Sequence, residues 1–188
     1  MCESRATSWR RLFQNPRTLH KGFFYDYMKA ITLTRGFHAL VDDEDFEELS
    51  KHKWYAWVSK HTCYAKRTIN INGKKTSVSM HRKILGITDS SIHVDHIDGN
   101  GLNNTRLNIR PCSCAENQMN RRAQKNNSSG FKGVTWDKRD RKWKAYIRVN
   151  KSQINLGYFQ DKNKAAEAYD KAAKLYHGDF ANLNLSNR

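Results

Sequence analysis

Hydrophobic and polar residues alternate along much of the chain after Met28, and this alternation predicts a protein built largely from short strands. In the first half the predicted strands cover residues 30–34, 37–41, 54–58, 63–71 and 74–79. The last two strands meet at Asn72-Gly73, a dipeptide typical of tight hairpin turns. We expect two short helices, one capped by Asp42 and running through His52, and one over residues 80–85.

The second half repeats the alternation after a polar run at residues 125–130, which its composition marks as a linker. Strands over 133–136, 143–149 and 154–159 predict a three-stranded antiparallel sheet. A helix over 162–177, capped by Asp161 and closed by Gly178, follows that sheet. Its alanines and tyrosines at helical spacing would let it lie close on the sheet; they are Ala165, Ala168, Tyr169, Ala172 and Tyr176.

These elements predict the α+β fold class and a division of the 188 residues into four segments. Residues 1–27 lack a clean period and are expected to form a flexible basic arm. Residues 28–124 form the first domain, 125–130 the linker, and 131–186 the second domain. No apolar run approaches the roughly 20 residues that cross a bilayer. The N-terminus also lacks a secretory signal, so we expect a cytoplasmic location and no membrane contact.

The charge balance points to a polyanionic partner. The chain has 34 Lys and Arg against 18 Asp and Glu, a net charge of +16. Residues 125–188 carry +8 of this charge, whereas six acidic residues crowd into positions 42–48. The remainder of the first domain is therefore more basic than the net charge of the whole domain indicates. Two basic surfaces on one chain predict two contacts with one long polyanion.

The chemically informative stretch spans residues 93–122, which we interpret as strand, loop, strand and helix. Asp95 and Asn117 supply oxygen ligands suited to one hard divalent cation, Mg²⁺, with Mn²⁺ as a substitute. His96 is a base that is mostly neutral at cellular pH, and the Asn108 amide is suited to orient its imidazole. Phosphodiester hydrolysis needs such a base and such a cation.

One conflict accompanies this interpretation. Strict alternation along a strand would send the side chains of Asp95 and His96 to opposite faces. We therefore expect the strand to end or bulge at this point. The neighbouring polar residues are expected to shape the loop rather than bind metal; they are Asp98, Asn100, Asn103 and Asn104.

At these residues the sequence resembles the HNH endonucleases, whose shared core is the ββα-metal motif, and more narrowly their phage and intron-encoded homing enzymes. The resemblance implies that His96 is the general base, Asn108 the middle asparagine, and Asp95 and Asn117 the metal ligands. The upstream segments 33–36, 41–45 and 80–82 also match that family. Pro111-Cys112-Ser113-Cys114 departs from it, because many relatives carry other polar residues there.

The second half resembles a different family, the DNA-binding domain of the plant APETALA2 and ethylene-response factors. The matching segments are 131–134, 143–148, 156–159, 165–170, 172–173 and 178–184. That family lays its sheet in the DNA major groove, and the resemblance implies DNA contacts by Lys132, Arg139, Trp143, Lys144 and Arg148. Thr135 and Asp137 stand where the plant domains usually carry arginines, so we do not expect the plant sequence preference to transfer.

Together the resemblances predict a metal-dependent endonuclease of the homing type that acts on double-stranded DNA and is anchored by its second domain. No protein partner is evident. Two alternatives stay open. The first is a DNA-binding regulator whose nuclease half is vestigial, against which the intact Asp95, His96, Asn108 and Asn117 count. The second is an RNA-directed nuclease or binder, although no RNP-like aromatic signature supports it.

Overall fold

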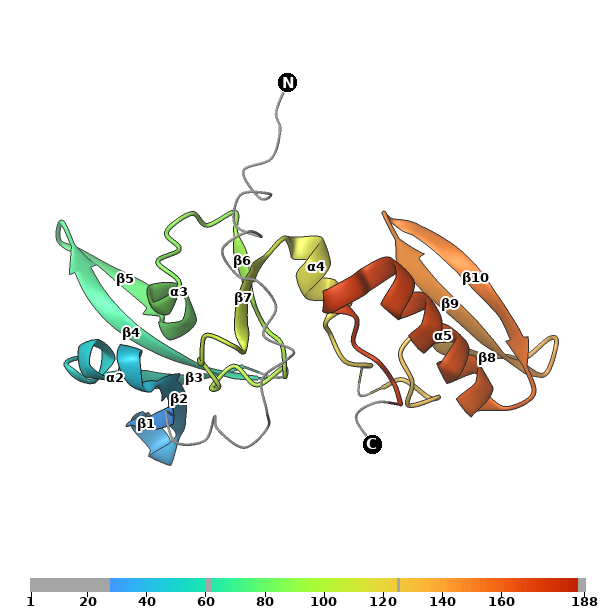
Figure 1. Cartoon of the computed structure of the whole chain (residues 1–188), viewed down its shortest axis with the longest axis horizontal. Helices are drawn as coiled ribbons and strands as arrows, with labels where there is room; N and C mark the ends of the chain where they lie inside the picture. Colours follow the sequence, from blue (N-terminus) through green and yellow to red (C-terminus); the bar gives the residue numbers. More distant parts are fainter. Residues whose placement is uncertain (1–27, 60–61, 125, 186–188) are drawn as a thin grey trace, which may run out of the picture.

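The structure is a computed structural model that describes residues 28–59, 62–124 and 126–185. The predicted basic arm, residues 1–27, lies outside the described residues. Two groups of elements follow one another along the chain, and we call residues 28–124 the N-terminal module and residues 126–185 the C-terminal module (Figure 1). Strands and a few helices occur in both, which confirms the mixed α and β prediction.

The N-terminal module contains β1 (Met28–Thr32), η2 (Thr34–Gly36), β2 (His38–Asp42), α2 (Asp43–Ser50), β3 (Tyr55–Val58), β4 (Cys63–Ile71), β5 (Lys74–Ser79), α3 (Met80–Ile84), β6 (His93–His96), β7 (Ile109–Cys112) and α4 (Cys114–Met119). Its strands form three antiparallel sheets, β1-β2, β3-β4-β5 and β6-β7. β4 and β5 coincide with the predicted strands, since Asn72 and Gly73 both adopt the positive φ that a tight hairpin turn requires.

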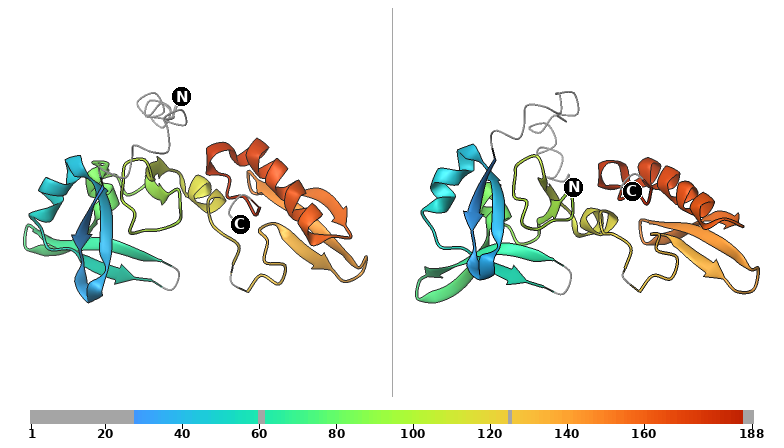
Figure 2. Two further views of the ribbon diagram at one scale, coloured as in Figure 1. Left: turned by 60° about the horizontal axis from the view of Figure 1, so that its bottom comes forward. Right: turned by 90° about the horizontal axis from the view of Figure 1, so that it is seen from below.

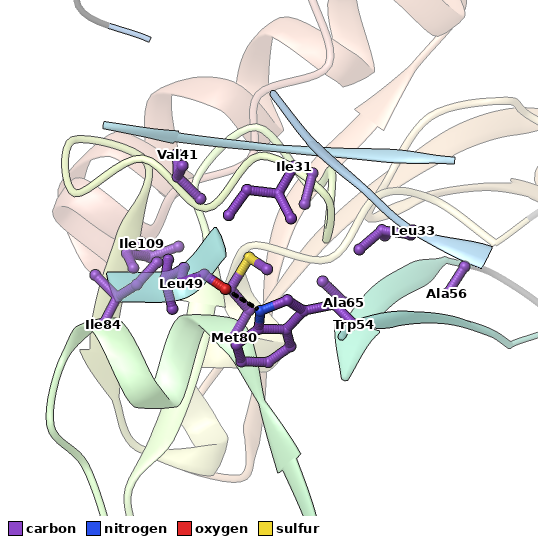
Figure 3. Close-up of a cluster of buried hydrophobic side chains, with 11 residues drawn as sticks. Ile31, Leu33, Val41, Leu49, Trp54, Ala56, Ala65, Met80, Ile84 and Ile109 are labelled. Atoms are coloured by element: carbon purple, nitrogen blue, oxygen red, sulfur yellow. Dashed lines mark hydrogen bonds between the residues drawn. The ribbon is translucent and has the colours of Figure 1, made fainter. Parts of the chain in front are cut away.

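One hydrophobic core joins most of these elements (Figure 3). Met80 is fully buried at its centre, and the indole of Trp54 lies beside it. The Trp54 Nε1–H donates to the Leu49 carbonyl at 2.8 Å, which satisfies the polar atom that the buried ring brings inside. Ile109 of β7 belongs to the same core. The two-stranded β6-β7 sheet is therefore anchored directly in the packed interior.

The acidic helix α2 has a different role from the expected one. Asp42 occupies the N-cap position, but its side chain does not cap the helix. Instead its Oδ2 accepts a hydrogen bond from the Arg106 backbone N–H at 2.6 Å, and the Arg106 guanidinium donates twice to Asp45 at 2.8 Å. The acidic residues thus attach the loop between β6 and β7 to α2.

The C-terminal module contains β8 (Val134–Asp137), β9 (Lys142–Val149), β10 (Ser152–Phe159), α5 (Lys162–His177) and η3 (Gly178–Phe180). The three strands form an antiparallel sheet with β9 in the middle, and α5 covers one of its faces (Figure 2). Ala165, Ala166 and Ala173 are fully buried, so the helix backbone approaches the sheet closely. Tyr176, predicted to continue this buried stripe, is 45% exposed.

The predicted linker is folded over the part that the structure describes, residues 126–130. The Ser129 hydroxyl donates to the Val134 carbonyl at 2.7 Å, and the Asn127 amide donates to the Phe131 carbonyl at 2.8 Å. These bonds tie the segment to the start of the C-terminal sheet. Among the described residues, no helix combines the length and apolar character needed to cross a membrane.

Two glycines give a matched test of this packing. Gly130 and Gly133 have φ angles of +73° and +71°, but only at Gly133 would a Cβ clash, lying 2.1 Å from the Tyr169 ring. Gly130→Ala is expected to cost about 1 kcal/mol of unfolding free energy through its backbone conformation. Gly133→Ala adds overpacking and is expected to cost about 3 kcal/mol or more. Urea denaturation of both variants measures the difference, and equal losses would contradict the packing described here.

Candidate active site

Asp95 is a buried carboxylate, 4% exposed, on β6 directly opposite Arg110 of β7. Its Oδ2 accepts hydrogen bonds from Arg110 Nε at 2.9 Å and Nη2 at 2.7 Å. The Asn120 side-chain amide donates to both carboxylate oxygens, at 3.0 and 3.1 Å. A charge buried to this degree is stable only when it is paired and hydrogen-bonded. Arg110 and Asn120 together meet that requirement.

His96 is also buried, 6% exposed, and its ring orientation is fixed by Asn104. The Asn104 Nδ2 donates to the Leu102 carbonyl at 3.2 Å, so its Oδ1 faces the imidazole, 3.3 Å from Nε2. An oxygen at that position requires Nε2 to donate, which leaves the lone pair on Nδ1. Burial lowers the pKa of His96, partly offset by this hydrogen bond. The imidazole is therefore neutral at cellular pH and carries a free base at a defined atom.

Asn104 is fully buried, and its position depends on β2. The Leu40 N–H donates to the Leu102 carbonyl and the Asn104 N–H donates to the Leu40 carbonyl, both at 2.8 Å. These bonds attach the loop between β6 and β7 to the edge of β2. Sequence analysis counted Asn104 among loop-shaping residues. Nothing in the residue type distinguishes it from the other asparagines of that loop.

Asn108 does not contact the His96 imidazole through its amide. Its Oδ1 accepts from the Asp98 backbone N–H at 3.0 Å, and its Nδ2 donates to Asp98 Oδ1 at 2.9 Å and to the Asn103 carbonyl at 2.7 Å. Asn108 thereby closes the loop that carries Asn104. The imidazole-orienting contact expected of Asn108 is made by Asn104, because the Asn108 amide is engaged by Asp98 and Asn103.

The helix after β7 is shorter than expected, ending at Met119 rather than near residue 123. Its start is as predicted, since Ser113 and Glu116 form a reciprocal capping box. Asn120, at the C-cap, also donates to the His96 carbonyl at 2.9 Å. Asn117 is half-buried one turn earlier, on the same helix face. Sequence analysis singled out Asn117 and missed Asn120, the residue hydrogen-bonded to Asp95.

Of the two expected alternatives, the strand ends at this point and does not bulge, so Asp95 and His96 keep the regular alternation. The β6-β7 register is regular, and β6 ends at His96. The Asp95 side chain accepts a hydrogen bond from Asn120, which directly follows α4. The His96 ring instead faces two other rings: its centroid lies 5.0 Å from that of His81 and 5.8 Å from that of Tyr64. Both side chains are buried because β6 is covered on both sides.

The donor set fits a hard divalent cation. Asp95 Oδ1 accepts a hydrogen bond from the Asn120 amide at the C-cap of α4, and Asn117 lies within the same helix; each asparagine also has an amide oxygen. Carboxylate and amide oxygens suit Mg²⁺ or Mn²⁺. Over the described residues, no three His, Cys, Asp or Glu side chains converge on a common point. Burial raises the pKa of Cys112 to about 12, so this residue is a neutral thiol in the metal-free chain.

Two of the predicted DNA-contacting residues lie on the uncovered face of the C-terminal sheet. Lys144 and Arg148 alternate along β9 with the buried Ala145 and Ile147, so they point away from α5. Arg148 is exposed, and Lys144 Nζ lies 5.8 Å from the Tyr158 ring. The sheet thus presents a face that is both cationic and aromatic.

The other three predicted contacts are placed elsewhere. Trp143 shares the α5 side of β9 with Ala145, and its ring is 5.0 Å from that of Trp136. Arg139 is exposed in the β8-β9 turn and pairs with Asp140 at 2.9 Å. Lys132 is half-buried, and its Nζ donates to the Met119 carbonyl at the end of α4. One of its three N–H donors is therefore engaged within the protein.

Comparisons with known proteins agree with this two-part organisation. The chain is 35% identical over 89 residues to Protein 3.8 of Escherichia phage T7, an alignment that covers 47% of this chain and 73% of that protein. It is 29% identical over 163 residues to the Uncharacterized HNH endonuclease L560 of Acanthamoeba polyphaga mimivirus, covering 84% and 80% of the two chains. The chain therefore belongs to the same family as Protein 3.8.

Plant transcription factors match a shorter stretch. The AP2-like ethylene-responsive transcription factor TOE2 of Arabidopsis thaliana is 37% identical over 68 residues, which are 36% of this chain and 14% of that protein. APETALA2-like protein 2 of Oryza sativa subsp. indica is 36% identical over 66 residues, which are 35% of this chain and 15% of that protein. These relatives confirm the resemblance to an HNH endonuclease joined to an APETALA2-type domain. No family model matches the chain. No solved structure matches it either.

The buried His81 beside His96 makes stability depend on pH. Its Nδ1 is buried and has no hydrogen-bond partner within the part of the chain that the structure describes. Its pKa is lowered from 6.5 to about 3 by burial, followed by the charges of His96, Arg82 and Lys66. The unfolded chain therefore binds a proton between pH 6.5 and about 3 that the folded chain does not. Stability is fully present above pH 6.5 and falls as the pH drops through this window.

His81→Phe should remove this dependence while keeping a ring of similar size. Between pH 7.5 and 5.0 the wild-type chain is expected to lose about 2 kcal/mol more unfolding free energy than the variant. Urea denaturation at the two pH values measures this difference directly. Parallel losses in both proteins would show that His81 is not a buried neutral group.

Proposed function

We propose that the chain is a metal-dependent DNA endonuclease of the HNH homing type, in which β6, β7 and α4 form a ββα-metal unit that hydrolyses phosphodiester bonds. The observation that carries this proposal is the state of His96. Its imidazole is buried and neutral, and Asn104 engages Nε2 so that Nδ1 is the basic atom. The similarity to a protein named as an HNH endonuclease over 84% of the chain supports the same reaction class.

His96 Nδ1 accepts a proton from the attacking water, as a general base does in hydrolysis. As the ring becomes charged, its Nε2–H bond to Asn104 Oδ1 strengthens and stabilises the imidazolium. Asp95, with Asn117 or Asn120, would hold Mg²⁺ or Mn²⁺, which when bound supplies charge stabilisation at the phosphate and the leaving 3′ oxygen. Arg110 and Asn120 fix the Asp95 carboxylate in one orientation.

The C-terminal module is the proposed DNA anchor, with residues 28–124 as the nuclease domain and 131–186 as the APETALA2-type domain. Lys144 and Arg148 supply cations on the uncovered sheet face, and Arg139 is an exposed cation in the β8-β9 turn. A cationic surface of this kind binds phosphates and makes affinity depend on salt. Double-stranded DNA is the partner that this arrangement fits.

The general-base role is tested with His96→Ala and a matched control on the same strand, His93→Ala, whose side chain is exposed. His96→Ala is expected to slow nicking of supercoiled plasmid in Mg²⁺ by about 100-fold or more, the usual contribution of a positioned base. DNA affinity should stay the same, because a neutral imidazole adds little to phosphate binding. His93→Ala should cut at the wild-type rate.

Three outcomes would count against this proposal. Equal rates for His96→Ala and the wild-type chain would remove His96 as the base. Full activity in EDTA would remove the divalent cation. A wild-type chain that binds DNA but cuts nothing in Mg²⁺ or Mn²⁺ would favour the alternative of a DNA-binding regulator with a vestigial nuclease half.

The anchor is tested by a salt titration of DNA binding. Each phosphate contact contributes about −0.9 to the slope of log affinity against log salt. The double variant Lys144→Gln/Arg148→Gln should therefore make the slope shallower by about 1.8 units. Lys164→Gln, on the far side of the sheet in α5 and paired with Glu167, is the matched control and should leave the slope unchanged. Identical slopes for all proteins would show that the β9 face is not the anchor.

A further inference from the structure

Arg110 joins the candidate metal site to the C-terminal module. While Nε and Nη2 bind Asp95, Nη1 donates to the Asp179 carbonyl at 2.9 Å. Its guanidinium carbon lies 3.8 Å from the centroid of the Phe180 ring. Because the guanidinium is planar, bonds at its edge and a ring on its face together leave it a single orientation. Both Asp179 and Phe180 belong to η3, which is part of the C-terminal module.

A second link reaches the other partner of Asp95. Lys132 Nζ donates to the carbonyl of Met119, the last residue of α4 and the neighbour of Asn120. That carbonyl has no partner within its own helix, and a cation at a helix C-terminus is stabilising. α4 is the part of the N-terminal module nearest to the C-terminal module and contacts η3, beside the end of α5 (Figure 1).

Lys132 is itself held rigidly. Its backbone N–H donates to Asn184 Oδ1 at 2.7 Å, and its carbonyl accepts from Asn184 Nδ2 at 3.1 Å. The buried Asp170 of α5 accepts from the Asn184 backbone N–H at 2.8 Å. The contact with α4 therefore originates from a fixed part of the C-terminal module rather than from a free surface lysine.

We propose that the C-terminal module is a structural component of the nuclease centre as well as its anchor, with Phe180 as a positioning residue for Arg110 and, through it, for Asp95. This inference rests on the proposed nuclease function. Without the Phe180 ring, one face of the guanidinium is open to water and Arg110 gains alternative orientations. The Asp95 carboxylate then loses its fixed position, and the site binds the divalent cation less tightly.

The test compares three variants of the full chain. Phe180→Ala removes the ring, Phe180→Tyr retains it, and Tyr176→Ala removes an exposed aromatic of the same module as a matched control. The first readout is the NMR signal of the Arg110 Nε–H, which is expected to be shifted and slow to exchange in the wild-type chain. The second is the Mg²⁺ concentration that gives half-maximal nicking at saturating DNA.

Phe180→Ala is expected to collapse the distinct Arg110 signal and to raise the Mg²⁺ requirement by about 10-fold or more, as the loss of a group supporting a metal ligand does. DNA affinity in EDTA should stay the same. Phe180→Tyr should restore both properties, and Tyr176→Ala should change neither. If Phe180→Ala does not fold, Phe180→Leu retains the apolar volume and should still weaken the Arg110 signal.

A Phe180→Ala protein with the wild-type Arg110 signal and Mg²⁺ requirement would overturn the inference, as would an unchanged Arg110 signal in a folded Phe180→Leu. If the proposed nuclease function is wrong, the experiment gives a different result. In that case the wild-type chain nicks no DNA, and the Arg110 signal alone decides whether Phe180 positions the guanidinium.

Discussion

The buried carboxylate of Asp95 is the constraint on which the arrangement of the site depends. Taking a charge out of water costs several kcal/mol, and removing one partner of a buried pair leaves that cost uncompensated. Its partners come from β7 and from the end of α4, Arg110 and Asn120 respectively. A one-residue slip of β7 against β6 would turn Arg110 to the opposite face. The Asp95 charge thus specifies both the strand register and the position of the helix.

The second candidate catalytic group depends on a different part of the chain. His96 is oriented by Asn104, and Asn104 is held by the backbone of Leu40 in β2. The same loop is attached to α2 through Arg106 and Asp45. The β-rich extension before β6 therefore helps to hold the His96 imidazole in place. Of the six acidic residues at positions 42–48, Asp42, Glu44 and Asp45 contact Arg106 and so help to hold this loop.

The elements that depend on local interactions can be predicted from the sequence. The Asn72-Gly73 turn predicts β5. Helical spacing and the Asp161 cap predict α5, and the Ser113 capping box predicts the start of α4. The roles of the asparagines could not be predicted in the same way. Residues 100–120 contain six asparagines at positions 100, 103, 104, 108, 117 and 120, all chemically identical. Only the fold decides which amide meets the imidazole and which meets the carboxylate.

Several of the cations counted in the net charge of +16 make contacts within the protein. Arg106 pairs with the α2 acids, Arg110 with Asp95, and Lys132 with the end of α4. Burial lowers the pKa of Lys132 to about 8, which is the behaviour of a structural rather than a solvated lysine. The cations that join the two modules are thus distinct from those on the uncovered face of β9. If the modules act as the docked unit proposed above, the separation between the anchored DNA segment and the cleaved bond is set by the protein and not by a flexible tether.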